Sequence, residues 1–240
     1  MLNKNLSNLV SVIIPYHKKI HFIDKCIESV LSQTFQNFEI ILIYDDNEFD
    51  ELDYIKNLAN KDPRIKLIIN KKKLGAGVSR NIGIDHGKGS LIAFIDADDM
   101  WKKNKLEIQV EFMEKNNLLF CHTSYEIIDK NNLIKGYRKA RDFYEVKDLL
   151  KSCDIGLSTV ILYKKIFSDK LKFPSLKTKE DFVLWLKVLD HDIKISSIDR
   201  PLTSWRKLDV SLSSSIIQKL SDAFKVYNYY MNFSFIKTCY

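Results

Sequence analysis

The chain has 240 residues, of which 45% are hydrophobic and 12% aromatic, enough to build the core of one large α/β domain or two small ones. Glycine and proline are few, seven and four residues, which argues against disorder over any long stretch. The formal net charge of +7 fits nucleic acid, an anionic membrane face or phosphorylated small molecules as partners and does not choose among them.

The cysteines and the hydropathy pattern bear on the compartment. The four cysteines are scattered and show no CxxC or Cys/His spacing, so zinc is not indicated and we expect a reducing compartment. Met1 to Leu9 is too polar for a secretion signal, and no apolar run reaches the length of a membrane span. We therefore expect a soluble, cytoplasmic protein, with peripheral association on the inner face of the cytoplasmic membrane left open.

Strands and helices alternate over the first hundred residues. Pro15 is expected to end the first strand, because proline cannot extend a central ladder. The alternation predicts a mostly parallel sheet covered on both faces. Apolar runs predict strands over 10–14, 39–44, 65–69 and 91–95. Apolar spacing of three and four predicts helices over 21–33, from 52 to a point before Pro63, and over 78–86.

The pattern after Trp101 is more mixed. Residues 134–155 look irregular apart from one short helix. Helices are predicted over 103–115, 146–151 and 182–189, and strands over 118–122, 125–128, 157–163, 193–198 and 201–205. The last 25 residues are spaced like one apolar helix face. That face either covers the core or an oligomer interface, which we favour, or docks on a membrane.

Polar residues follow three of the predicted parallel strands: Pro15 and Tyr16, Asp45 and Asp46, and the run from Asp96 to Asp99. Ligand groups gather beyond the carboxyl ends of such strands. Carboxylates packed as closely as those at 96, 98 and 99 repel one another and tolerate ionisation best beside a cation. The cluster therefore points to a hard divalent metal with oxygen ligands, against the simpler interpretation of a solvated acidic loop. No GxGxxG or Walker loop is present.

In chain order these motifs resemble those of the inverting glycosyltransferase family 2, which has the GT-A fold. The resemblance runs from about Leu9 to Ser213. It is carried by the segments at 10–16, 29–41, 45–46, 77–83, 94–99 and 180–185. It implies an α/β fold with a Rossmann-like, mostly parallel central sheet flanked by helices and a smaller mixed acceptor-side part. The catalytic domain would span 1–215, with a nucleotide-sugar half over about 9–101, an acceptor half over about 102–215, and a C-terminal amphipathic helix at 216–240.

The resemblance also implies roles on the donor side. A divalent cation, Mn²⁺ or Mg²⁺, would bind Asp98 together with Asp96, or Asp99 in place of Asp98. Residues matching the family's nucleotide-sugar site are Pro15, Tyr16, Asp45, Asp46, Arg80, Asp96, Ala97 and Asp98. The donor would be a nucleotide-diphosphate sugar, most commonly a UDP-sugar in this family.

On the acceptor side, Asp181 matches the catalytic base, with Glu180 beside it. Trp185 either packs beneath the acceptor pocket or is a core tryptophan. Leu208 stands where the family has a histidine, so Arg206 or Lys207 would supply positive charge. The acceptor would be a glycan or lipid-linked glycan in bacterial surface polysaccharide, capsule or lipooligosaccharide synthesis.

Two alternatives to an active transferase were considered. A catalytically weak nucleotide-sugar or glycan binding module would keep the fold without the chemistry, and the intact acids at 96, 98 and 181 argue against it. A nucleic-acid-binding protein is suggested by charge alone and shows no recognition module.

Overall fold

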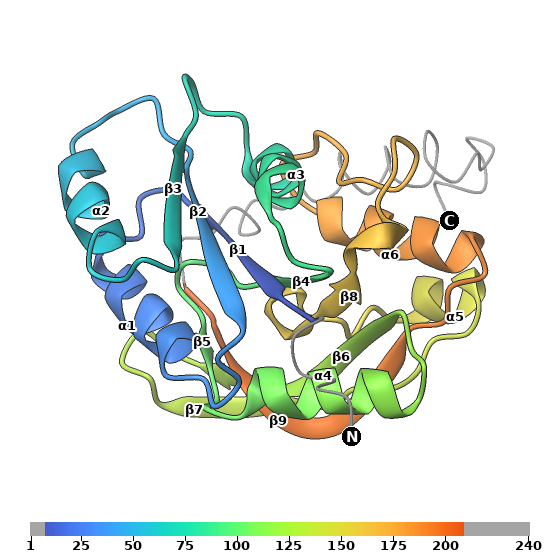
Figure 1. Ribbon diagram of the computed structural model, residues 1–240. Helices are drawn as coiled ribbons and strands as arrows, with labels where there is room; N and C mark the ends of the chain where they lie inside the picture. The colour runs from blue at the N-terminus through green and yellow to red at the C-terminus, as the bar shows by residue number, and fades with distance from the viewer. Residues whose placement is uncertain (1–7, 209–240) are drawn as a thin grey trace, which may run out of the picture.

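The computed structural model describes residues 8–208 (Figure 1). The predicted C-terminal helix over 216–240 lies outside these residues, as does the serine-rich segment before it. The strands are β1 Val10–Tyr16, β2 Phe38–Tyr44, β3 Ile65–Ile69, β4 Leu91–Phe94, β5 Met100–Trp101, β6 Phe120–Ile128, β7 Ile134–Arg138, β8 Ile161–Tyr163 and β9 Ser196–Arg206. The α-helices are α1 Ile20–Leu31, α2 Leu52–Ala59, α3 Ala76–His86, α4 Lys105–Lys115, α5 Val146–Lys151 and α6 Glu180–Asp190.

One sheet runs through the described part of the chain, in the order β3-β2-β1-β4-β8-β6-β9-β5, with β7 paired to β6. The first four of these strands are parallel, as predicted, and β1 lies between β2 and β4. Beyond β4 the sheet becomes mixed, because β8 is antiparallel to β4 and β9 is parallel to β6. The predicted division into a parallel part and a mixed part is therefore observed, but within residues 8–208 the mixed part, with five strands against four, is not the smaller one.

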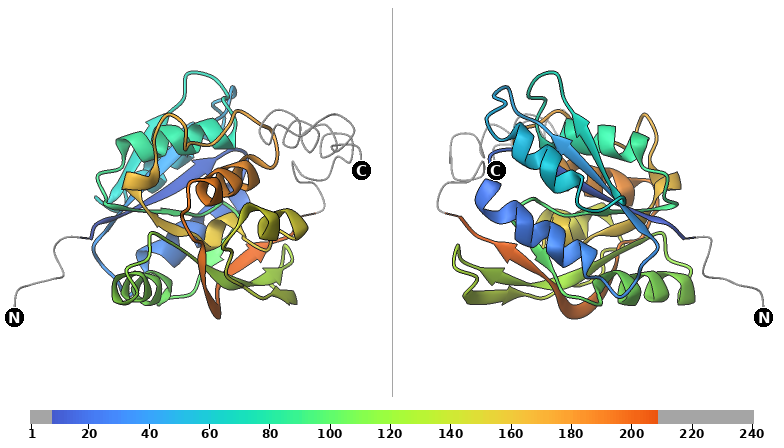
Figure 2. Two further views of the ribbon diagram at one scale, coloured as in Figure 1. Left: turned by 90° about the vertical axis from the view of Figure 1, so that its right-hand side faces the viewer. Right: turned by 60° about the vertical axis from the view of Figure 1, so that its left-hand side comes forward.

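Helices cover both faces of the sheet, and each face has its own core. Alternate residues of β1 and β2 point to opposite sides, so that Val12 packs with α1, α2 and α4 while Ile13 packs with α3, α5 and α6. The right-hand view of Figure 2 shows α1 and α2 together in front of the first strands. This layering leaves the carboxyl ends of β1, β2 and β4 at one edge of the sheet.

The prediction that Pro15 ends the first strand is wrong. β1 continues to Tyr16, and the carbonyl of Tyr16 accepts a hydrogen bond from the Asp45 amide at 2.9 Å. The backbone of Pro15 faces the side of β4, whose pairing with β1 has already stopped opposite Ile13. The missing N–H of proline therefore costs no ladder hydrogen bond.

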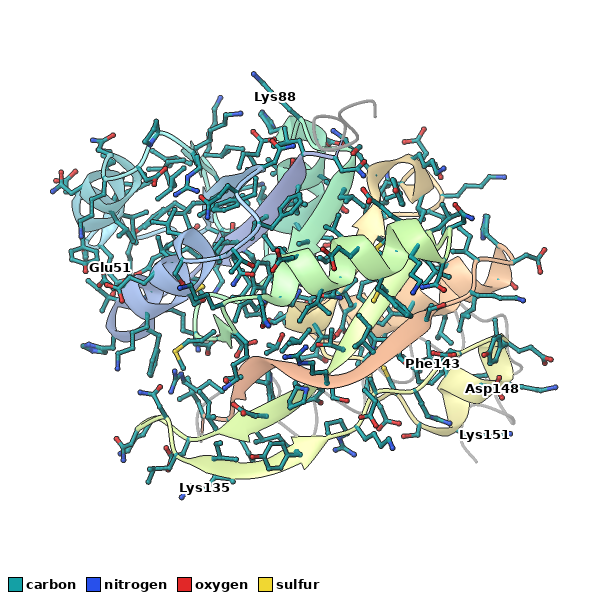
Figure 3. All side chains as sticks on the ribbon, turned by 60° about the horizontal axis from the view of Figure 1, so that its bottom comes forward. Glu51, Lys88, Lys135, Phe143, Asp148 and Lys151 are labelled. Atoms are coloured by element: carbon teal, nitrogen blue, oxygen red, sulfur yellow. The ribbon has the colours of Figure 1, made fainter. Side chains whose placement is uncertain are left out.

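Three further boundaries differ from the predictions. The pairs of strands predicted at 118–128 and 193–205 are single strands, β6 and β9, and register shifts between them accommodate Pro201. Residues 134–138, predicted as irregular, form β7, an exposed strand without an apolar run that pairs along β6; Lys135 marks it in Figure 3. Residues 157–159 form a 3₁₀ turn before β8.

Candidate active site

The acidic loop after β4 lies where three strand ends meet, and its three carboxylates have different surroundings. Asp96 is 36% exposed, and its Oδ1 lies 2.7 Å from Arg80 Nη2. The Oδ2 atom of Asp98 lies 2.7 Å from Lys19 Nζ. Asp99 is buried, and it accepts hydrogen bonds from the Ser158 hydroxyl at 2.5 Å and from the Arg206 amide at 2.7 Å.

Asp99 is therefore an internal anchor of the loop. Its two oxygens are each held by a donor, and burial raises its pKa well above the usual range. The side chain of Ala97 is also buried, in the core shared with α1. Of the two acids that the sequence left in competition for a metal, Asp98 is the less enclosed. Burial raises the pKa of Asp98, and Lys19 opposes that shift.

Asp96 and Asp98 fit a hard divalent cation, although no group of three His, Cys, Asp or Glu side chains between residues 8 and 208 is arranged to hold a metal ion. Magnesium is commonly held by one or two protein carboxylates, with substrate phosphates and water completing the shell. Two carboxylates at the end of a central strand match that donor set. The protein would thus supply part of the coordination and the diphosphate of a substrate the rest.

The predicted base pocket lies beside this loop. The ring of Tyr16 stacks on Tyr44 with centroids 5.7 Å apart, and Tyr44 stacks on Phe49 at 6.2 Å. The hydroxyl of Tyr16 donates to Glu51, which Figure 3 places near α1 and α2. Burial and this hydrogen bond raise the pKa of Tyr16, so the phenol stays protonated. A cavity of about 140 Å³ opens here, lined by Lys18, Tyr44, Asp46, Glu48, Asp50 and Glu51.

Asp45 and Asp46 have separate roles in this region. Asp45 accepts hydrogen bonds from the amides of Leu74 and Gly75, at 2.7 and 2.8 Å, and from the Asn70 side chain. It therefore holds the loop that leads into α3. Asp46 lies against the cavity, 3.0 Å from His17 Nδ1. Of the two acids, Asp46 is the one placed to meet a ligand.

Arg80 connects the acidic loop to the start of α6. Its buried guanidinium donates to Asp96 Oδ1 and to Glu180 Oε1, both at 2.7 Å. Burial would lower the pKa of Arg80, but the two carboxylates raise it above its ordinary value, so it stays charged. Close packing makes this bridge possible: a Cβ on Gly77 would lie 2.8 Å from the Pro174 carbonyl oxygen and 3.1 Å from Glu180 Cγ.

Asp181 lies next to this bridge, in the first turn of α6. Lys179, just before the helix, has a left-handed backbone with φ of 63°. Burial, with the charge of Glu180 beside it, raises the pKa of Asp181 to about 6 against the opposing effect of Arg80. A carboxylate with that pKa is ionised at neutral pH and is a better proton acceptor than an ordinary aspartate.

Two residues predicted on the acceptor side, Trp185 and Arg206, are buried and contact other parts of the protein. Trp185 is fully buried, with Phe120 and Phe173 edge-on to its ring at 5.0 and 6.2 Å, so it belongs to the core. Arg206 is buried beneath the acidic loop, where its guanidinium donates to the carbonyls of Asp98 and Asp129. It does not reach toward α6 as an acceptor-side residue would.

The sequence did not identify Lys19 and Ser158 as site residues. Ser158 accepts from the Asp96 amide at 3.0 Å and donates to Asp99, so it fixes both ends of the loop. It lies on the 3₁₀ turn that had been predicted as a strand. Lys19 lies in the short turn between β1 and α1, which is the only signal in the sequence that it could lie near the strand ends.

A larger cavity, of about 390 Å³, lies elsewhere. It includes Asn8, before the start of β1, and Tyr163, which pairs with the first residue of β4. It is therefore at the amino ends of the parallel strands, opposite the acidic loop. The candidate active site is therefore identified by its acidic residues and not by the size of the cavity.

Comparison with known proteins shows which proteins the chain is similar to. Residues 11–170 match the model of the family described as glycosyl transferase family 2. The chain is 38% identical over 213 residues to WfgD of Escherichia coli, named as UDP-Glc:alpha-D-GlcNAc-diphosphoundecaprenol beta-1,3-glucosyltransferase, covering 88% of this chain and 82% of WfgD. It is 36% identical to an uncharacterized glycosyltransferase of Rickettsia felis, covering 82% of this chain and 33% of that protein. The chain thus spans about a third of the Rickettsia protein.

Solved structures show the same fold. The crystal structure of S. aureus TarS 1–349 in complex with UDP-GlcNAc superposes with a TM-score of 0.73 at 18% identity, covering 91% of this chain and 66% of that one. Between residues 8 and 208 no helix has the length and hydropathy needed to cross a membrane.

Proposed function

This chain belongs to glycosyltransferase family 2 and has the GT-A fold, and from that premise we propose that it transfers a sugar, with inversion, from a nucleotide-diphosphate sugar to an acceptor hydroxyl. One observation carries the proposal. Arg80 bridges Asp96, at the predicted donor site, to Glu180, beside the predicted base Asp181. A donor-side acid and a potential base, Asp96 and Asp181, which lie far apart in the sequence, are thereby held in one site.

The donor half would bind the nucleotide in the cavity by Tyr16 and Asp46 and the diphosphate by the acidic loop. Pro15 would border the base. When bound to Asp98 and Asp96, Mn²⁺ or Mg²⁺ would offset the negative charge that grows on the diphosphate as it leaves. The loop itself is held in place by Ser158 and the Arg206 amide. The carboxylates of Asp96 and Asp98 are therefore presented in a fixed geometry.

The acceptor half would use Asp181 as the only general base. The acceptor hydroxyl oxygen bonds to the anomeric carbon, the bond from that carbon to the diphosphate oxygen breaks, and the hydroxyl proton passes to Asp181. A single displacement of this kind inverts the anomeric centre. Proton removal by a positioned carboxylate contributes roughly 10²–10⁴-fold. One base is sufficient here, in contrast to the pair of opposed carboxylates in a glycosidase.

The chemical identities of donor and acceptor are proposed from the relatives. WfgD is named for UDP-glucose as donor and for a GlcNAc-diphosphoundecaprenol acceptor. We therefore propose a UDP-sugar donor and a lipid-diphosphate-linked sugar acceptor, used in the synthesis of a surface glycan. An acceptor of this kind lies in a membrane, so the enzyme would work peripherally at the cytoplasmic face.

The test separates donor binding from transfer. Asp181→Asn is expected to abolish transfer from UDP-glucose to a synthetic GlcNAc-diphospholipid, while UDP binding measured by calorimetry stays unchanged. Asp190→Asn, at the exposed far end of the same helix, is the matched control and is expected to retain both. Full transfer by Asp181→Asn would remove Asp181 as the base. Failure of the wild-type protein to bind any nucleotide-diphosphate sugar would remove the proposed function.

A further inference from the structure

Lys19 has a charged contact within the candidate site that the proposed function does not use. Its Nζ lies 2.7 Å from Asp98 Oδ2, with the side chains of Lys19 and Asp98 exposed by only 28% and 16%. Between residues 8 and 208, no other lysine or arginine side chain pairs with the Asp98 carboxylate. A positive charge is therefore held at the acid predicted to carry the cation of the donor.

The backbone around Lys19 fixes this placement. Lys18 has a left-handed backbone with φ of 49°, which turns the chain sharply between β1 and α1. The carbonyl of Lys19 then accepts hydrogen bonds from the amides of Phe22 and Ile23, at 2.9 and 3.0 Å, so Lys19 begins the helix. Its ammonium group thus extends from the residue that directly precedes a well-formed helix, α1.

Helix α1 is itself attached to the acidic loop. The Cys26 thiol lies 3.5 Å from the Asp96 carbonyl oxygen, and the Trp101 amide donates to the Ser29 hydroxyl at 3.1 Å. These contacts fix α1 relative to the acidic loop, with Lys19 at its amino end facing Asp98. The ammonium group is consequently preorganised, and a ligand at the loop would meet it with little loss of side-chain freedom.

The other positive groups near the loop do not face it freely. The buried guanidinium of Arg80 is held between Asp96 and Glu180, and Lys207 is exposed just beyond the end of β9. The guanidinium of Arg206 donates to the Asp98 and Asp129 carbonyls and to the Asn132 side chain, at 2.7 to 2.8 Å. Leu208, where the family has a histidine, offers no donor. Positive charge for a diphosphate therefore has to come from elsewhere, and Lys19 reaches the loop from the side of α1.

We propose that Lys19 is a donor-binding residue whose ammonium group contacts the diphosphate of the nucleotide sugar, beside the cation held by Asp98. The inference rests on the proposed function and assigns it a further residue. An ammonium group is a common phosphate ligand, as a compact charge with three donors. Asp98 orients that group at the loop, and both the ammonium and a divalent cation then face the leaving diphosphate.

The experiment measures UDP binding by calorimetry, in EDTA and in Mn²⁺. Lys19→Met is expected to weaken UDP binding about tenfold in EDTA, as for the loss of one charge-assisted hydrogen bond, and less in Mn²⁺, where the cation offsets part of the diphosphate charge. Lys19→Arg keeps a positive charge and is expected to recover most of the affinity. Lys139→Met is the matched control, because Lys139 pairs with the exposed Asp199 and lines neither cavity.

The outcomes separate three cases. Equal UDP affinity of the wild-type protein and Lys19→Met, in EDTA and in Mn²⁺, would overturn the role of Lys19 and leave the donor site standing. An equal loss in Lys139→Met would also overturn it, since the effect would then be one of general surface charge. No UDP binding by the wild-type protein would overturn the UDP donor site and Lys19 together. Thermal unfolding without UDP checks that each variant is folded, and a merely structural lysine would change that measurement and not UDP affinity.

Discussion

The acidic loop and the start of α6 each carry two neighbouring acids, and in both pairs the fold binds one acid more firmly than the other. In the loop, Asp99 is enclosed by Ser158 and the Arg206 amide, while Asp98 meets only the Lys19 side chain. At α6, Glu180 is paired with Arg80, while the Asp181 side chain accepts a hydrogen bond from the Phe182 amide at 2.7 Å.

The difference between the two less constrained acids matches their proposed roles. Asp98 has the Lys19 ammonium group beside it, which suits an acid that gathers positive charge at the leaving diphosphate. Asp181 has no ion pair within the described part of the chain, and burial raises its pKa to about 6. A carboxylate that must take a proton benefits from such a pKa. In each pair, therefore, an anchored acid positions its neighbour, and the environment of the neighbour sets its chemistry.

Breaking the link between the two pairs should have the largest effect. Arg80→Met would leave Glu180 buried without its partner and free Asp96. We expect a loss of about 3–5 kcal/mol in the free energy of unfolding, measured by urea denaturation, and loss of sugar transfer. The stability and activity of Arg80→Lys should lie between those of the wild-type protein and Arg80→Met. An ammonium group keeps the positive charge but cannot present the two fixed donors of a guanidinium.

Arg64→Met provides the matched control for this prediction. Arg64 also pairs with an aspartate, Asp62, at 2.8 Å. The side chains of Arg64 and Asp62, at 29% and 20%, are more exposed than those of Arg80 and Glu180. Its loss should cost less than about 1 kcal/mol. If Arg80→Met is no less stable than Arg64→Met, the buried bridge does not organise the site.

The first half of the fold could be predicted from sequence because its central strands are buried on both faces. Apolar runs such as 39–44 and 91–95 have few other solutions, and the acidic residues that follow them lie at one edge because the strands are parallel. β7 could not be predicted in this way. Its sequence, Ile-Lys-Gly-Tyr-Arg, is mostly exposed, and the strand exists because β6 offers it an edge.

The acids of the site could be identified from sequence, whereas the different role of each acid could not. Nothing in the run from Asp96 to Asp99 distinguishes an enclosed carboxylate from an available one. That distinction comes from Ser158 and Arg206, which lie 59 and 107 residues from Asp99 along the chain. The contact of Lys19 with Asp98 similarly depends on how α1 packs, over a separation of 79 residues.

Two asparagine substitutions in the acidic loop should have different effects, one mainly on stability and the other mainly on activity. Asp99→Asn retains only one acceptor oxygen for two donors, so we expect the free energy of unfolding to fall by about 2–3 kcal/mol. Asp98→Asn loses a partly exposed ion pair and should cost less than about 1 kcal/mol. It should nevertheless lower transfer by roughly a hundredfold or more, because the cation that offsets the diphosphate charge is held less well.

Urea unfolding and turnover measured on the same preparations test this division, with activity recorded over a range of Mn²⁺ concentrations. Higher Mn²⁺ should partly restore Asp98→Asn and should leave the stability of Asp99→Asn unchanged. The reverse pattern, in which Asp99→Asn responds to Mn²⁺ and Asp98→Asn is unstable, would exchange the roles of the two acids.

The smallest expected effect is a gain in stability from Asp181→Asn. Because the pKa of Asp181 is raised from 3.8 to about 6, the folded protein holds this proton more tightly than the unfolded chain. The associated stability is complete below pH 4 and is lost as pH rises through 6. Asparagine resembles the protonated acid, so Asp181→Asn should be more stable than the wild-type protein by about 1–2 kcal/mol at pH 8 and equal to it at pH 4.

The same ionisation should govern the rate, with the opposite sign. Transfer by the wild-type protein needs the carboxylate, so kcat/KM should fall about tenfold for each pH unit below 6. The pH at which the fall in stability ends and the pH at which activity levels off would then coincide near 6, measured by thermal unfolding and by transfer assays in the same buffers. If the two transitions lie well apart, the group that controls the rate is not Asp181, and the acid at the start of α6 would be an ordinary helix residue.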